Sequence, residues 1–117
     1  MSRTEKRRLG DRGERRTVLY LILRGYRILE RGYTFGHKEV DIIAKRGRVL
    51  AFVEVKTRTD PRVPPSAAVN AEKRKNVTCA ALAYMRSHDC SGCVVRFDVA
   101  EVTPENGVNY IKAAFSV

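Results

Sequence analysis

The sequence VLAFVEVK, residues 49–56, is a run of apolar residues that only Glu54 and Lys56 interrupt. Such a run is typical of a strand that is buried on both faces of a sheet. Because side chains alternate along a strand, Glu54 and Lys56 lie on the same face. A charged side chain in the interior is costly unless it has a partner. We therefore expect residues 48–57 to form a central strand that also carries a functional site.

The preceding segment, residues 38–45, is predicted to be the partner strand of a hairpin, with Arg46-Gly47 as the turn. This segment also places a charge, Asp41, among apolar neighbours. The turn sets Asp41 opposite a residue between 52 and 55, so its carboxylate approaches that of Glu54. The hairpin thus brings two carboxylates and a lysine ammonium together.

Two carboxylates this close repel each other, and a bound divalent cation relieves the repulsion. A small number of hard oxygen ligands suits Mg²⁺ or Mn²⁺, which retain water and use substrate phosphate as a further ligand. Such an ion can activate water and stabilise charge during phosphodiester hydrolysis, while Lys56 orients the water or neutralises developing charge. The alternative is a salt-bridged triad that only ties the hairpin together, although buried ion pairs contribute little net stability.

The rest of the chain predicts two helices, three further strands and a proline-rich loop. These segments are helices at 11–24 and 67–87, strands at 26–34, 93–102 and 108–113, and a loop at 58–66. The order α-β-β-β-α-β-β indicates an α/β fold with a central mixed five-stranded sheet flanked by helices. In a chain of 117 residues we expect a single domain at 11–117, preceded by a basic tail at 1–10.

The first helix directs one acidic side chain towards the core. Val18, Leu21 and Ile22 recur at helical spacing and predict its buried stripe. Glu14 lies four residues before Val18 and therefore shares this stripe. An inward carboxylate needs a partner, so Glu14 is a further candidate site residue.

The charge balance indicates a polyanionic partner. The chain has 23 Lys and Arg residues against 13 Asp and Glu, a formal charge of +10, and residues 1–31 alone hold ten basic and four acidic side chains. This excess suits DNA or RNA, with a solvated basic helix as the alternative. An anionic membrane is less favoured, because the basic residues precede the apolar stretch instead of lying on its opposite face.

Neither a membrane span nor a secretory signal is expected. No apolar run approaches the roughly 18 residues of a span, and the basic start lacks an adjoining apolar stretch. We therefore expect a cytoplasmic protein without a membrane partner, in which Cys79, Cys90 and Cys93 stay reduced. The single Cys-x-x-Cys precedes a strand, which favours an ordinary turn over a zinc or redox site.

Two other acidic residues have simpler predicted roles. Glu39 shares a strand face with Asp41, and we expect it to pair with Arg48 or Arg58, with an approach to the metal as the alternative. Asp98 lies in the middle of a strand, where a structural ion pair with Arg96 or another basic residue is the expected arrangement.

The candidate residues occur in an order that resembles a known family. Asp41, followed after twelve residues by Glu54-Val55-Lys56, is similar to the D…(D/E)xK signature of the PD-(D/E)XK nuclease superfamily. The flanking segments are Gly13-Glu14, Leu21 to Leu29, and residues 39–44, 52–58 and 96–99. Together they resemble the YraN-like family of small bacterial proteins, which is distantly similar to archaeal Holliday-junction resolvases, over about residues 10 to 115.

The resemblance implies a restriction-endonuclease-like fold and a catalytic set of Glu14, Asp41, Glu54 and Lys56. It implies that Asp41 and Glu54 bind Mg²⁺ or Mn²⁺, with the carbonyl of Val55 as a further metal ligand. It also implies that Glu14 is the acidic residue that completes such sites in the resolvase-like branch, in agreement with its inward position.

We therefore expect a metal-dependent endonuclease acting on DNA, with branched or structured DNA suggested only by the similarity to resolvases. The alternatives are a nucleic-acid-binding protein with this fold that cleaves weakly or not at all, and a protein–protein adaptor. DNA is the expected partner, RNA is an open alternative, and a homodimer would suit a two-fold junction. For Lys73, which we also consider as a phosphate contact, the alternative role is contact with the metal site. The candidate phosphate-contacting residues are Arg12, Arg15, Arg16, Arg58, Lys73, Arg74 and Lys75.

Overall fold

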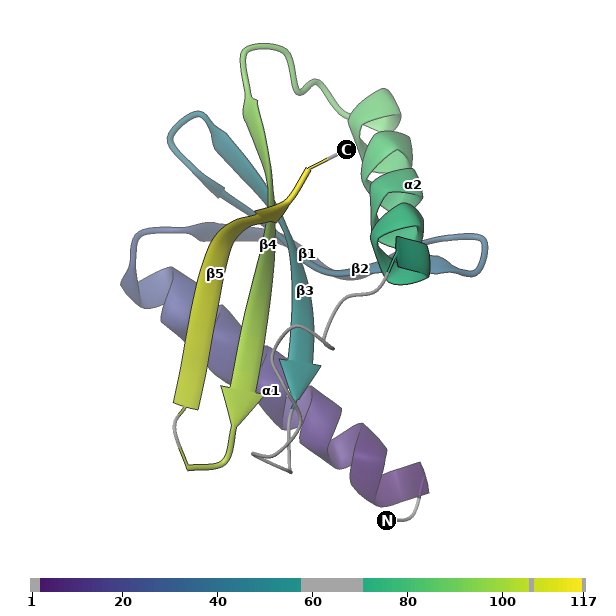
Figure 1. Cartoon of the computed structure of the whole chain (residues 1–117). Helices are drawn as coiled ribbons and strands as arrows, with labels where there is room; N and C mark the ends of the chain where they lie inside the picture. Colours follow the sequence, from purple (N-terminus) through teal and green to yellow (C-terminus); the bar gives the residue numbers. More distant parts are fainter. Residues whose placement is uncertain (1–2, 58–70, 106, 117) are drawn as a thin grey trace.

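The computed structural model describes residues 3–57 (backbone only before Asp11), 71–105 and 107–116. Its elements are α1 (Arg3–Leu23), β1 (Arg27–Phe35), β2 (Lys38–Arg46), β3 (Val49–Thr57), α2 (Ala71–Ser87), β4 (Val94–Thr103) and β5 (Gly107–Phe115). This order and the mixed five-stranded sheet confirm the predicted fold class (Figure 1).

The sheet has the strand order β1-β2-β3-β4-β5. All neighbouring strands are antiparallel except β3 and β4, which are parallel. A parallel pair needs a long connection instead of a hairpin, and α2 lies within that connection.

Strand β3 is the buried centre that its apolar run predicts, and its residues 50–54 are all buried. Phe52 packs with Val77 of α2, whereas the next residue, Val53, packs with Leu21 of α1. Because neighbouring residues of a strand point to opposite faces, the two helices cover opposite faces of the sheet (Figure 1).

The helices differ from the prediction in two ways. Helix α1 begins at Arg3, so the backbone of residues 3–10 is helical, where a tail was expected; a polar stretch has no apolar periodicity that would mark it as a helix. Ile22, assigned to the buried stripe, is 52% exposed, whereas Leu21 is buried. Successive residues lie about 100° apart around a helix, and at this position only Leu21 faces the sheet.

Two predicted features lie outside the described residues. They are the proline-rich loop at 58–66, which includes Arg58, and the start of the second helix before Ala71.

Over the described parts of the chain, neither helix has the length and apolar character needed to cross a membrane. The three cysteines are partly buried free thiols. The Cys93 amide donates a hydrogen bond to the Cys90 carbonyl, which agrees with the ordinary turn expected there.

Candidate metal centre

The site forms where β2 leaves β3. The last residue pair between these strands is Ile42 with Val53, whereas pairing of β2 with β1 continues to the first residue of β2. One further step of this register would set Asp41 opposite Glu54, within the range that the sequence predicts. Instead of continuing the ladder, Asp41 accepts a hydrogen bond of 2.8 Å on its Oδ2 from the Val55 amide.

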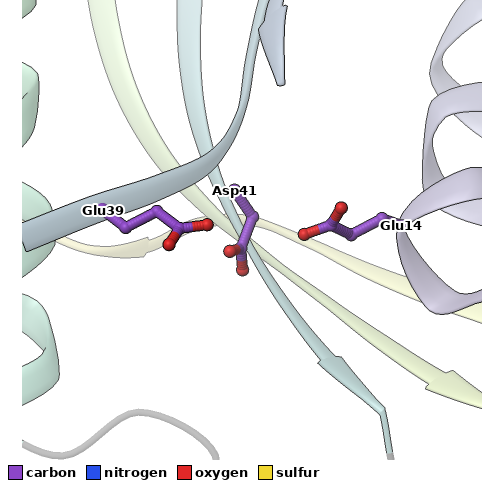
Figure 2. Close-up of side chains that lie close together, drawn as sticks. All are labelled: Glu14, Glu39 and Asp41. Carbon is purple, nitrogen blue, oxygen red and sulfur yellow. The ribbon is translucent and has the colours of Figure 1, made fainter. Parts of the chain in front are cut away.

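Three carboxylates meet at this divergence. Glu14 comes from α1 and Glu39 and Asp41 come from β2, and one oxygen of each lies within 4.8 Å of the others. Figure 2 shows Glu14 and Glu39 pointing towards Asp41 from opposite sides. All the donor atoms are carboxylate oxygens, which fit Mg²⁺ or Mn²⁺, whereas structural zinc sites are built mainly from cysteine and histidine.

A fourth carboxylate, Glu54, is held from the α2 side. Its side chain is 2% exposed, and its Oε1 lies 2.8 Å from Nζ of Lys73. Lys73 is in the first turn of α2, four residues before the buried Val77, so it lies on the inward stripe of the helix. Glu54 is also close enough to Asp41 for their carboxyl groups to share a hydrogen bond. Lys73 therefore contacts the site, which was its alternative role.

Crowding changes the acidity of all four groups. Burial raises the pKa of Glu54 to about 7, and the negative charge of Asp41 adds to this effect. The pKa of Asp41 is also raised, because burial outweighs the opposing effect of the hydrogen bond from the Val55 amide. The pKa values of Glu14 and Glu39 are raised mainly by burial and then by the charge of Asp41. A divalent cation would relieve this repulsion and favour the ionised form of each group.

Two basic side chains offset part of the negative charge. Arg31 of β1 lies 3.6 Å from Glu14, and Lys73 pairs with Glu54. Burial lowers the pKa of Lys73, but its hydrogen bond with Glu54 and the surrounding carboxylates outweigh burial, so the pKa is raised overall. Lys56 is exposed near the end of β3. The structure thus places Lys73 against the buried carboxylate and leaves Lys56 on the solvent side.

The predicted pairing of Glu39 with Arg48 is wrong, and its pairing with Arg58 stays a prediction. Arg48 instead donates a hydrogen bond of 3.1 Å to the Gly92 carbonyl, and Arg58 lies outside the described residues. Glu39 instead joins the carboxylate group, which was the less favoured alternative in the sequence prediction. The signal was present in the sequence, because a spacing of two residues puts Glu39 and Asp41 on the same strand face.

The candidate phosphate-contacting side chains lie on both helices. Arg12, Arg15 and Arg16 are exposed on α1, and Arg74 and Lys75 are exposed on α2. The structure brings two of them together around a cavity of about 40 Å³, which is lined by Arg12, Gly13, Arg16, Thr57, Val102 and Pro104.

Close packing of α1 on β3 shapes this cavity. Gly13 is needed there, because a Cβ at this position would lie 2.4 Å from Oγ1 of Thr57. Arg16 is anchored by a hydrogen bond of 3.1 Å from its Nη1 to the Thr103 carbonyl. Guanidinium groups beside a hydroxyl group are well suited to binding phosphate oxygens.

The solved structure of Hjc, described as a Holliday junction resolvase from the archaeal hyperthermophile Archaeoglobus fulgidus, has a similar fold. The TM-score is 0.56, the sequence identity is 22%, and the match covers 89% of this chain and 72% of that chain. At this identity the likeness shows the fold alone, and it agrees with the expected endonuclease-like architecture.

Sequence comparisons define the family. Residues 13–102 match the family model described as "Uncharacterised protein family UPF0102". A UPF0102 protein of Chlorobaculum parvum is 40% identical over 119 residues, which cover 93% of this chain and 92% of the relative. A UPF0102 protein of Caldicellulosiruptor saccharolyticus is 40% identical over 116 residues, which cover 94% and 98%. This chain therefore belongs to the UPF0102 family, the YraN family that its motifs resemble.

Proposed function

We propose that the protein is a divalent-metal-dependent endonuclease that hydrolyses phosphodiester bonds in DNA. The observation that supports this function most strongly is the group of carboxylates gathered where β2 leaves β3, namely Glu14, Glu39, Asp41 and Glu54. They are concentrated in a chain of formal charge +10. Perturbed acidic groups of this kind cluster at functional sites, and a cation offsets their repulsion next to a phosphate.

Asp41 is the central ligand of the proposed site. The Val55 amide fixes its Oδ2, and Glu14 and Glu39 flank it. A bound Mg²⁺ or Mn²⁺ would supply Lewis-acid polarisation of the phosphodiester and would lower the pKa of an attacking water. The Val55 carbonyl stays a predicted further ligand. Lys56, on the exposed end of β3, is available to offset the charge of the substrate phosphate.

The basic side chains would hold the DNA backbone on either side of the site. Arg12 and Arg16 line the cavity beside Thr57, so we assign this cavity to a phosphate that flanks the reacting one. The other proposed backbone contacts are Arg15, Arg58, Arg74 and Lys75. Such contacts fix the position of the duplex but carry little sequence information.

Branched DNA is the substrate class to test first, because the solved structure with a similar fold is described as a Holliday junction resolvase. A four-way junction has two-fold symmetry, so we propose a homodimer as the matching assembly.

The test is a cleavage assay with linear, nicked and four-way-junction DNA and with single-stranded RNA, each in Mg²⁺, Mn²⁺ or EDTA. The wild-type protein should cleave DNA only with metal. Asp41→Asn should reduce the rate by at least about 10³-fold, since a metal contributes several kcal/mol of transition-state stabilisation. Lys56→Ala should also reduce it, and Lys112→Ala, which changes an exposed lysine of β5, should not. Cleavage that persists in EDTA, or in Asp41→Asn, would contradict the proposal.

A second candidate function is nucleic-acid binding without hydrolysis. The pairing of Glu54 with Lys73 favours it, because this contact already occupies one oxygen of a proposed site carboxylate. Salt-sensitive DNA binding in all metal conditions, with no cleavage of any substrate, would establish this function in place of the endonuclease.

A further inference from the structure

The charges around Asp41 indicate how many metal ions the centre can hold. Among the described residues, the carboxylates of the group are Glu14, Glu39, Asp41 and Glu54. Within the same described ranges, the basic side chains in ion-pair contact with them are Arg31, at 3.6 Å from Glu14, and Lys73, at 2.8 Å from Glu54. Four ionised carboxylates and two cations leave a net charge of −2.

One divalent cation brings this group to neutrality, whereas two would leave it with a charge of +2. An excess of positive charge in a partly buried site is costly, because like charges repel strongly where water is scarce. A second divalent ion would also have to approach the ammonium group that already lies beside Glu54. The charge balance therefore favours a single ion.

The contact between Lys73 and Glu54 is built into the fold. Glu54 lies on the central strand and is 2% exposed, so it needs a cationic or hydrogen-bonding partner. Lys73 stands one helical turn before Val77, whose burial fixes the position of α2 on the sheet. The Lys73 side chain is itself 48% exposed. The Lys73 ammonium group thus extends from a helix that is packed on the sheet to a carboxylate on the central strand. Because the Lys73 side chain is not part of the hydrophobic core, replacing it should leave the core intact.

We propose that the centre takes a single divalent cation and that the Lys73 ammonium occupies the place beside Glu54 that a second cation would otherwise fill. This inference rests on the proposed metal-dependent function and specifies its metal content. Lys73 is a positioning residue, because it acts through Glu54. It holds the Glu54 carboxylate in place through their ion pair, and the remaining carboxylates hold the ion.

The test is isothermal titration calorimetry with Mn²⁺, using chelator-treated full-length protein at pH 8 without DNA. The wild-type protein should bind one Mn²⁺ per chain. Lys73→Met and Lys73→Gln should each bind two, because the place beside Glu54 becomes available. Lys73→Arg should bind one, because the guanidinium group preserves the charge.

Two controls locate the effect. Lys75→Met removes the same charge from an exposed position on the same helix and should still bind one ion. The double variant Lys73→Met/Glu54→Gln should return from two ions to one, because the second ion loses its carboxylate. Circular dichroism and a thermal melt establish that each variant is folded.

The outcomes separate this inference from the proposed function. Two ions in the wild type, or one ion in both Lys73→Met and Lys73→Gln, would overturn the inference and leave metal-dependent cleavage standing. One ion in the wild type with no cleavage of any DNA would overturn the endonuclease and leave the stoichiometry standing. No Mn²⁺ binding by the wild type would overturn both.

Discussion

Two aspartates in the same sheet, the buried Asp98 and the half-buried Asp41, have opposite surroundings. Asp98 of β4 is fully buried and accepts hydrogen bonds from the Arg96 guanidinium, the Tyr110 hydroxyl and the Ala113 amide. Asp41 of β2 accepts a hydrogen bond from the Val55 amide and otherwise faces further carboxylates. The first carboxylate is surrounded by donors, and the second is surrounded by groups of its own charge.

This difference distinguishes a carboxylate with a structural role, Asp98, from one with a proposed functional role, Asp41. A buried carboxylate with a full set of donors is satisfied and stabilises one arrangement of the chain. The ion pair of Asp98 with Arg96, at 2.9 Å, confirms the structural role that the sequence predicts for it. A carboxylate crowded by others is repelled by their charge, and a bound cation would offset that repulsion.

Asp98→Ala should lower the free energy of unfolding by about 3–5 kcal/mol, because it leaves the Arg96 guanidinium largely buried without its partner. Asp41→Asn should change it by less than about 1 kcal/mol, since the amide oxygen can still accept from Val55 while the repulsion is reduced. Urea denaturation of the metal-free proteins measures both. If Asp41→Asn were the more damaging change, the division between a structural and a functional carboxylate would be wrong.

The stability of the metal-free protein should fall as the pH rises from 4.5 to 7. Burial raises the pKa of Glu54 from 4.5 to about 7, so in this window the folded chain holds a proton that the unfolded chain has lost. Such a shift corresponds to about 3 kcal/mol of lost stability. The quantity to measure is the difference between the wild type and Glu54→Gln in urea denaturation at each pH. A difference that does not change with pH would show that Glu54 titrates normally.

Gly13→Ala should lower the free energy of unfolding by about 1–3 kcal/mol, as overpacking does in a tight contact. The added Cβ would lie 2.4 Å from Oγ1 of Thr57. Thr57→Ala in the same chain should restore part of the loss, because it removes the atom that the new Cβ meets. Thermal denaturation of the single and double variants measures the coupling, and purely additive effects would contradict the close contact.

Arg12→Ala should weaken DNA binding without changing stability, because its exposed guanidinium lines the cavity assigned to phosphate. One lost phosphate contact should reduce the slope of log K against log salt by about 0.9. Fluorescence anisotropy in EDTA measures binding apart from cleavage. Arg86→Ala, at the far end of α2, is the matched control and should leave the slope unchanged. Equal slopes for the wild type and Arg12→Ala would show that the cavity is not part of the DNA-binding surface.

Local sequence patterns predict the elements well, because each depends on residues close together in the chain. The apolar run around Glu54 predicts β3, and the turn after residues 38–45 sets Asp41 near it. The helical stripe places Glu14 on the inward side of α1. These three acidic residues follow from periodicity and register alone.

The partners of these residues depend on how distant elements dock, which local patterns do not contain. Glu39 reaches the site because β2 leaves β3 at Asp41, and Lys73 reaches Glu54 because α2 packs on that face. The first residues of α1 are polar, so they lack the apolar periodicity from which a helix is predicted. Ion pairs within one strand, such as Arg96 with Asp98, are thus predictable, whereas ion-pair partners on different elements are set by the tertiary packing.

The central claim is that the carboxylates around Asp41 bind a divalent cation. It is tested most directly by anomalous X-ray scattering from crystals of the full chain soaked in Mn²⁺. We expect one anomalous peak per chain, bounded by Glu14, Glu39 and Asp41, and no peak there in crystals of Asp41→Asn. A wild-type crystal without a peak at this position, or with its manganese bound elsewhere on the chain, would contradict it.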